Sequence, residues 1–211
     1  MRTVRGFTLI ELLVALAVMA LMATIGWQAL GGMQQAMAVN RSHNDAVLTT
    51  EAGLNQWAAD LNALAELPTT RALEWDGRTL RLTRSSTQPG EGAVVVAWTR
   101  AERGGESRWL RWQSPPVQTR EGWEAAWAAA NAWSQGAQIA AGEVSVVALA
   151  SWQVFFFRGG TWSNPLSSTD SQDASVVPDG VRLVLNLPAP HPLAGALVRD
   201  WARPILTGAA R

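Results

Sequence analysis

The sequence contains no cysteine, no tyrosine and no lysine, and only two histidines in 211 residues. The absence of cysteine excludes disulfides, thiolate metal centres, iron–sulfur clusters and a thiol nucleophile. The basic residues are therefore all arginines, and 17 of them balance 17 acidic residues to give a formal net charge of zero. This balance gives no electrostatic reason to expect a nucleic-acid partner.

The two histidines offer little chemistry. His43 falls on the polar side of a helical stretch, and His191 falls in a proline-rich stretch. Neither has a carboxylate at ligand-like spacing, so we expect neither a zinc site nor a catalytic role. There is no nucleophile elbow and no phosphate-binding glycine loop. We therefore expect no enzymatic activity, no cofactor and no metal. A membrane-anchored enzyme, the alternative from another class, would need a cleft with convergent titratable groups.

The sequence does contain a long apolar segment near its amino terminus. From Phe7 to Trp27 the only ionisable side chain is Glu11. A helix over this span is about 31 Å long, which matches the hydrocarbon core of a bilayer. Arg2 and Arg5 precede it, so the positive-inside rule predicts a cytoplasmic amino terminus and export of everything after Trp27. The two arginines need no further role.

Glu11 is the unusual residue of this segment. A charge at the centre of a membrane helix costs about 2.5–3.5 kcal/mol, so such a carboxylate is rarely left without a partner. If the chain is cut after Gly6, Phe7 supplies a new α-amino group four residues before Glu11. The amine and the carboxylate of neighbouring copies could then neutralise each other. This interpretation makes Glu11 a residue that sets subunit register in a helical bundle.

The stretch Gly6-Phe7-Thr8-Leu9-Ile10-Glu11, after a short basic leader, resembles the signal of the type IV pilin and type II secretion pseudopilin superfamily. The resemblance implies that a prepilin peptidase cleaves between Gly6 and Phe7 and methylates the Phe7 amine. The alternatives are a signal peptide, cut for example after Ala36-Met37-Ala38, or a plain signal anchor. Signal peptides usually have shorter apolar regions without an acidic residue.

The pattern after Trp27 becomes amphipathic and predicts that one helix runs from Phe7 to about Glu66, stopped by Pro68. Its second half should pack on a globular domain through apolar residues at helical spacings. These are Met33, Met37, Val47, Leu48, Leu54, Trp57, Leu61 and Leu64. The predicted organisation is a leader at residues 1–6, a transmembrane helix at 7–27, an amphipathic continuation at 28–67 and a β-rich domain at 68–211.

Strand patterns dominate the remaining chain. We expect a hairpin around Asp76-Gly77, strands at 93–100 and 108–113, a strand region at 144–158 with a bend near Ala150-Ser151, and a strand at 181–187. The alanine-rich stretch 121–133 predicts a short helix. Four prolines predict that the carboxyl-terminal stretch is extended or irregular: Pro188, Pro190, Pro192 and Pro204. The fold class is therefore α+β and pilin-like, with one long amino-terminal helix packed on antiparallel sheet.

Three further motifs resemble the J-type minor pseudopilin of type II secretion. Trp27-Gln28-Ala29-Leu30 follows the membrane run, and Asp60-Leu61 stands late in the long helix. The third motif is a turn after a strand, Gly159-Gly160-Thr161-Trp162-Ser163-Asn164-Pro165-Leu166. The tryptophan-rich segment 109–133 departs from the pattern of that family, and the sequence assigns it no role.

The resemblance implies an inner-membrane protein with a periplasmic carboxyl-terminal domain. It would join the I-type and K-type minor pseudopilins and the major pseudopilin in a pseudopilus tip complex that starts fibre assembly. Prepilin peptidase, which is also the N-methyltransferase, is the implied processing partner. The alternative within the superfamily is a minor pilin that primes a type IV pilus, with a role in adhesion or DNA uptake.

Two other sites can be imagined from composition. Asp170, Asp173 and Asp179 share one loop and could gather around calcium, although a solvated acidic loop explains them better. A carbohydrate platform could use several of the tryptophans: Trp98, Trp109, Trp112, Trp123, Trp127 and Trp162. Trp109 and Trp112 should face opposite sides of their strand. We therefore expect core packing and subunit contact to account for most of these side chains.

Overall fold

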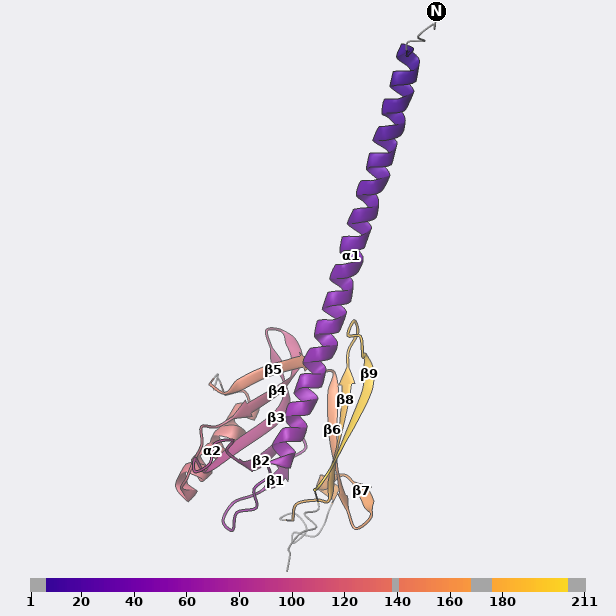
Figure 1. The fold of residues 1–211 in the computed structure, drawn as a ribbon. Coiled ribbons are helices and arrows are strands. Elements are labelled where there is room, and N and C mark those ends of the chain that lie inside the picture. The colour runs from indigo at the N-terminus through magenta and orange to yellow at the C-terminus, as the bar shows by residue number, and fades with distance from the viewer. Residues whose placement is uncertain (1–6, 138–140, 168–175, 205–211) are drawn as a thin grey trace, which may run out of the picture. The chain divides into compact units, whose positions relative to one another are not determined.

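The computed structural model describes residues 7–137, 141–167 and 176–204 (Figure 1). The chain divides into two units, Met1–Asp45 and Ala46–Arg211. The described part of the first unit is helical from Leu9 onward, and the second unit holds the last turns of the same helix, a second helix and two antiparallel sheets. The predicted α+β, pilin-like layout is thus confirmed.

Helix α1 spans Leu9–Asn62, which is shorter at both ends than predicted. It begins after Thr8, whose side chain caps the first turn. It ends before Glu66 because the following residues pair with the sheet: the Ala65 N–H donates to the Thr83 carbonyl, and Leu64 forms a bridge with Arg84. This pairing, rather than Pro68, ends the helix.

The apolar residues predicted to pack α1 on the domain do so only in its last turns. Leu54, Trp57 and Leu61 are buried and Leu64 is partly buried, whereas Met33, Met37 and Leu48 are exposed. Val47 is half-buried. The expectation of packing is therefore confirmed for Leu54, Trp57 and Leu61, whereas Leu48 departs from it. The helical spacing continues through both regions, so spacing alone could not locate where packing begins.

The first sheet, sheet A, has the strand order β1-β2-β3-β4-β5, and all its pairs are antiparallel. Its strands are β1 (Leu73–Trp75), β2 (Thr79–Ser85), β3 (Ala93–Arg103), β4 (Glu106–Gln113) and β5 (Glu143–Ala148). The predicted hairpin at Asp76-Gly77 joins β1 to β2, and Gly77 adopts the positive φ of 89° that this turn requires.

The second sheet, sheet B, has the order β7-β6-β8-β9 and is also antiparallel. Its strands are β6 (Ser151–Arg158), β7 (Thr161–Ser163), β8 (Gly180–Leu187) and β9 (Gly195–Ala202), with a 3-10 turn, η1, at Pro165–Ser167. The predicted bend at Ala150-Ser151 is where the chain passes from sheet A to sheet B. The carboxyl-terminal stretch was predicted to be extended or irregular. It is extended at Gly195–Ala202, where it forms strand β9 between the prolines.

The main core lies where α1 residues of the second unit meet one face of each sheet (Figure 1). Strand alternation decides which side chains enter it. Sheet A contributes Leu80, Leu82, Val94, Val96, Trp98 and Trp109, and sheet B contributes Val154, Phe156, Val181, Leu183, Leu185 and Trp201.

Helix α2 (Arg120–Ser134) covers the opposite face of sheet A. Thr119 caps it by accepting the Gly122 N–H at 3.1 Å. Its buried side chains pack on Val95, Ala97, Leu110 and Trp112 in a second core; they are Trp123, Ala126, Ala130 and Trp133. The tryptophan-rich segment that the sequence left without a role therefore builds a third layer over the sheet.

One close approach fixes α1 against sheet A. The register of β4 and β5 shifts between Trp109 and Leu110, so that Val146 and Val147 both enter the main core. Gly53 of α1 faces this irregularity: a Cβ at Gly53 would stand 2.4 Å from Val146 Cγ1. Only glycine allows the helix to pack this closely here.

Candidate functional site

The first described residues form a cap around Glu11. Its carboxylate accepts hydrogen bonds from the Thr8 backbone N–H at 3.0 Å and from the Thr8 hydroxyl at 2.9 Å. The Thr8 hydroxyl in turn accepts the Glu11 N–H at 3.4 Å. This reciprocal arrangement is a capping box, which satisfies N–H groups that a helix start leaves open. This second task of Glu11 was not predicted, although the Thr-x-x-Glu spacing is typical of a capping box.

The capping box places the Glu11 carboxylate next to the residue that would become the new amino terminus. Phe7 precedes Thr8 and is 87% exposed. Gly6, Arg2 and Arg5 lie outside the described residues. Cleavage between Gly6 and Phe7, methylation of Phe7 and the register role of Glu11 therefore remain predictions.

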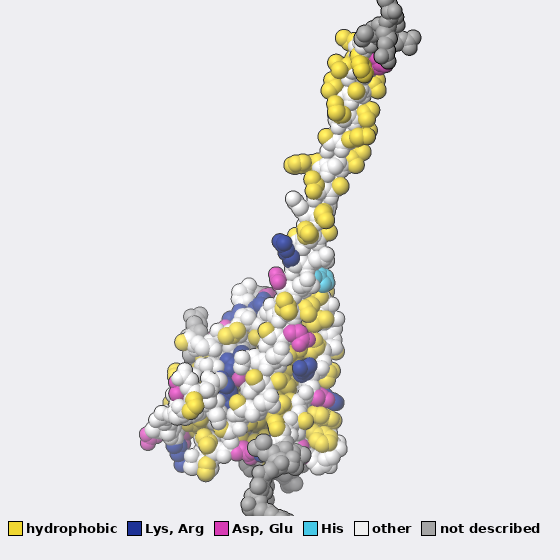
Figure 2. Space-filling model, viewed as in Figure 1, with side chains coloured by type: hydrophobic (Ala, Val, Ile, Leu, Met, Phe, Trp, Pro, Cys, Tyr) yellow, Lys and Arg dark blue, Asp and Glu magenta, His cyan; other side chains and the backbone are white. Residues whose placement is uncertain are grey.

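The amino-terminal part of α1 is long and apolar enough to cross a membrane. Its large hydrophobic side chains are exposed, and Figure 2 shows hydrophobic side chains around this part of the helix. Trp27 and Leu30 of the predicted motif belong to this exposed set. An exposed apolar surface of this extent favours membrane anchoring.

Asp60, the acidic residue of the second predicted motif, is fully buried. Its carboxylate accepts two hydrogen bonds of 2.8 Å from the Arg111 guanidinium and one of 3.0 Å from the Trp98 indole. Gln56, one turn earlier in α1, donates a further bond at 3.0 Å. A buried carboxylate requires such partners because it has lost its hydration. Asp60 is thus the polar anchor of α1 on sheet A.

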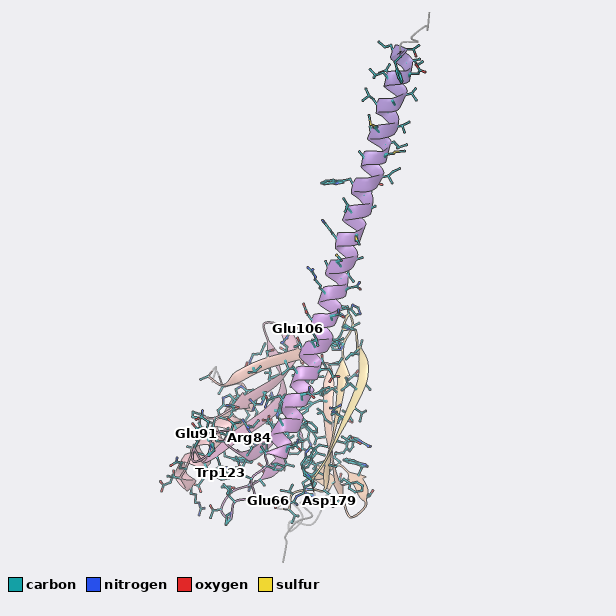
Figure 3. The ribbon with its side chains drawn as sticks, in the orientation of Figure 1. Glu66, Arg84, Glu91, Glu106, Trp123 and Asp179 are labelled. Atoms are coloured by element: carbon teal, nitrogen blue, oxygen red, sulfur yellow. The ribbon has the colours of Figure 1, made fainter. Side chains whose placement is uncertain are left out.

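Two further side chains complete the Asp60 anchor. Arg84 of β2 approaches the carboxylate at 3.4 Å, and Gln113 accepts a hydrogen bond from Arg111 at 2.9 Å. Asp60 was named from the sequence, but these partners were not. The alternation in Arg-Trp-Leu-Arg-Trp-Gln could have indicated that Arg111 is buried, because it places Arg111 on the same face as Trp109. Figure 3 labels Arg84 on the sheet A side of the core.

A second ion pair fastens the far end of α2. Arg103 of β3 donates two hydrogen bonds of 2.8 Å to Glu143 of β5, and the Trp133 indole N–H donates to the same carboxylate. The hydrogen bonds from Arg103 lower the pKa of Glu143, assisted by Trp133, while partial burial opposes them. The same contacts raise the pKa of Arg103. This link holds the third layer on sheet A.

The tryptophans of the imagined carbohydrate platform are mostly in the cores. Trp98, Trp109, Trp112 and Trp123 are buried, whereas Trp127 and Trp162 are half-buried. Trp109 enters the main core and Trp112 the α2 core, so the prediction of opposite faces is confirmed. Figure 3 labels Trp123 at the α2 layer. Burial of Trp98, Trp109, Trp112 and Trp123 leaves these four rings no face on which a sugar could stack.

The remaining predicted residues lie apart from one another. His43 is exposed on α1. The His191 Nε2 lies 3.1 Å from the Thr50 hydroxyl, and its Nδ1 accepts the Leu193 N–H at 3.0 Å, so His191 ties the loop before β9 to α1. Asp170 and Asp173 fall outside the described residues, and Asp179 is exposed. Within the described parts of the chain, no three His, Asp or Glu side chains gather as a metal site.

The third predicted motif forms the turn after a strand that its resemblance implied. Gly159 and Gly160 join β6 to β7, with φ values of 55° and 83° that only glycine adopts easily. The Asn164 side chain then accepts the Leu166 N–H at 3.0 Å and starts the 3-10 turn. Trp162 lies in β7, where the Arg182 guanidinium stands 4.3 Å from its ring centroid.

Comparison with known proteins bears on the amino-terminal site. Residues 1–27 match the prokaryotic N-terminal methylation motif, which covers the basic leader, Phe7, Glu11 and the apolar run. No curated protein matches the chain. The motif supports a protein of the type IV pilin or pseudopilin type, and the long apolar helix and antiparallel sheets agree with a pilin-like layout.

Proposed function

We propose that this protein is a minor pseudopilin of a type II secretion system, of the J type. It serves in the tip complex that starts pseudopilus assembly for protein export across the outer membrane. The observation that carries the proposal is the methylation motif at residues 1–27, followed by a helix that can cross a membrane and a β-rich globular unit. In this role the protein is an assembly subunit without enzymatic activity.

Two local structures support the J-type assignment over a general pilin assignment. The Asp60 motif serves as the buried anchor of α1, and the Gly159-Gly160 motif forms a tight turn after β6. Both are structural tasks that depend on residue type, so the resemblance rests on residues with a definite structural role. The methylation motif at residues 1–27 supports the pilin-type part of the proposal. The Asp60 and Gly159-Gly160 motifs, which favour the secretion role, lie after these residues.

The proposal includes processing and topology. Prepilin peptidase cuts between Gly6 and Phe7 and methylates the new amine, and Glu11 then sets register against a neighbouring subunit. The amino terminus is cytoplasmic and the globular unit periplasmic, as the arginines at positions 2 and 5 favour. The I-type and K-type minor pseudopilins and the major pseudopilin are the proposed partners.

A minor pilin of a type IV pilus is the second candidate, since the methylation motif is common to both machines. Co-purification of the full chain from membranes of its native host distinguishes them. Recovery of I-type and K-type pseudopilins supports the secretion role. Recovery of type IV pilus subunits instead would overturn the secretion assignment and leave the pilin-type class intact.

A further inference from the structure

Strand β9 lies at the edge of sheet B and pairs on one side only, with β8 (Figure 1). The pairing is regular over all eight residues from Gly195 to Ala202, without a bulge. The strand contains neither proline nor lysine, and its described neighbours do not pair with its outer edge. Natural proteins usually block such an edge with these devices, because an open edge pairs with another strand.

The hydrogen bonds around β8 show which β9 groups point outward. The Arg203 N–H donates to the Asp179 carbonyl, so the N–H groups two and four residues earlier also face β8. By the same alternation, the N–H and C=O groups of Ala196, Val198 and Asp200 point away from the sheet. A second hydrogen bond gives the same result. The Ala150 N–H donates to the Asn186 carbonyl, so the backbone polar groups of Asn186 face β6 and not β9. Those of Ala196, its partner on β9, therefore face outward.

The sheet surface beside this edge is partly apolar, and its charged pair, Arg182 and Asp200, is joined within the sheet. Val154 and Phe156 enter the main core, so Phe155 and Phe157 face the other side of sheet B, where both are only half-buried. Val198 on β9 is 54% exposed on the same side, next to the half-buried Val184. A strand added at the edge would extend this surface, and its side chains on this face would contact Val198.

One charge on β9 also lacks a partner. Arg199 is exposed between Leu197 and Trp201, and the described residues offer it no ion pair. Its neighbour Asp200 is already held by Arg182 through two hydrogen bonds of 2.7 Å. A second copy of β9 therefore brings no free carboxylate to Arg199, whereas a different strand can.

We propose that the outer edge of β9 receives an extended strand of a different polypeptide. This strand hydrogen-bonds to Ala196, Val198 and Asp200 and places a carboxylate opposite Arg199 and apolar side chains beside Val198. The recognition mode is strand addition, in which backbone bonds give affinity and alternate side chains give specificity. The identification of this polypeptide as another subunit of the fibre rests on the proposed function. The observation that the edge of β9 is open does not depend on it.

The experiment uses the full chain in membranes of the native host. Because the chain has no cysteine, Ala196→Cys places a single attachment point on the exposed edge for a photoactivatable crosslinker. Mass spectrometry then identifies the crosslinked peptide. We expect a peptide of a different polypeptide that has strand-like alternation and an Asp or Glu residue.

Substitutions in the same Ala196→Cys background test the mode of binding. Val198→Pro removes an outward N–H without breaking a bond to β8 and should lower the crosslink yield about tenfold, as expected for one lost backbone bond and a displaced strand. Val198→Ala, the matched control, keeps the N–H and should retain most of the yield. Arg199→Ala should lower the yield about threefold. Arg78→Ala, which changes an exposed arginine in the turn between β1 and β2, should not.

Four results would overturn the proposal: crosslinks to a second copy of this chain, crosslinks to lipid only, no crosslink, or equal yields from Val198→Pro and Val198→Ala. Hydrogen exchange of the β8 amides checks that sheet B stays folded in each variant. The same samples are probed for co-purifying pilin-type subunits. Loss of the crosslink with intact co-purification rejects only the strand-addition proposal, whereas absence of such subunits rejects the proposed function.

Discussion

The Asp60 carboxylate of α1 and the Arg111 guanidinium of β4 meet through two hydrogen bonds of 2.8 Å inside the main core. The pair joins residues that are 51 positions apart in the chain. It fixes the last turns of α1 on sheet A.

Removal of Asp60 should destabilise the globular unit strongly. Asp60→Ala leaves Arg111 and Arg84 buried without a counter-charge, and we expect a loss of about 3–5 kcal/mol in the free energy of unfolding. Urea unfolding of the full chain in detergent, followed by tryptophan fluorescence, measures the loss. Glu51→Ala on the exposed side of α1 is the control and should change stability by less than about 0.5 kcal/mol. Similar values for both variants would contradict the anchor role.

Substitution of Gly53 should test the close approach of α1 to β5. Gly53→Val places side-chain atoms where Val146 stands, and we expect a loss of about 1–3 kcal/mol or more from overpacking. Gly26→Val adds the same side chain to an open position of α1 and should leave the globular unit unchanged. The combination Gly53→Ala with Val146→Ala should recover part of the loss. Failure of that recovery would show that contact with Val146 is not the cause.

The α2 layer should loosen in acid because Glu143 holds it. The pKa of Glu143 in the folded protein lies below its ordinary value of 4.5. Such a carboxyl contributes its full stabilisation at pH values above 4.5, and this stabilisation is lost as the pH falls through the lower folded pKa. We expect the Trp133 environment to change below about pH 4.5, as fluorescence and near-ultraviolet circular dichroism would detect. Glu143→Gln should remove this step, whereas Glu102→Gln on the exposed part of β3 should retain it. An unchanged acid transition in Glu143→Gln would assign the transition to other groups.

Glu11→Val should separate membrane insertion from assembly. The substitution removes a costly charge from the apolar segment, so insertion should be retained. If Glu11 sets register, co-purification with neighbouring subunits should fall about tenfold or more, since a charge pair in an apolar setting is lost. Thr24→Val, which removes a hydroxyl bonded only to its own helix, is the control. Equal recovery of partners from Glu11→Val and the control would contradict the register role.

Local patterns predicted much of this fold. The apolar run, the hairpin at Asp76-Gly77, the helix at 120–134 and the bend near Ala150 are each determined by residues close together in the sequence. The end of α1 was mispredicted because Ala65 pairs with Thr83, a contact between distant segments. Strand β9 was not predicted because the prolines on either side of it indicated only an extended or irregular chain. Pairing with β8, a distant segment, makes these residues a strand.

The residues of the candidate site that are close together in the sequence could be predicted, and the partners that only the fold brings to them could not. The leader motif and Glu11 are contiguous and could be identified directly, and Asp60 could be named from its two-residue motif. The partners of Asp60 come from β2 and β4, and only the fold brings Arg84 and Arg111 to it. The role of the tryptophan-rich segment depended on the second face of sheet A, which no local pattern reveals.

The amino terminus of the mature protein tests the central claim most directly. Intact mass and amino-terminal sequencing of the membrane form, from cells with active prepilin peptidase, should show loss of Met1–Gly6, gain of one methyl group and a first residue of Phe7. An uncut chain, or a mature chain that begins anywhere else, would contradict the account of this protein as a processed pilin-type subunit.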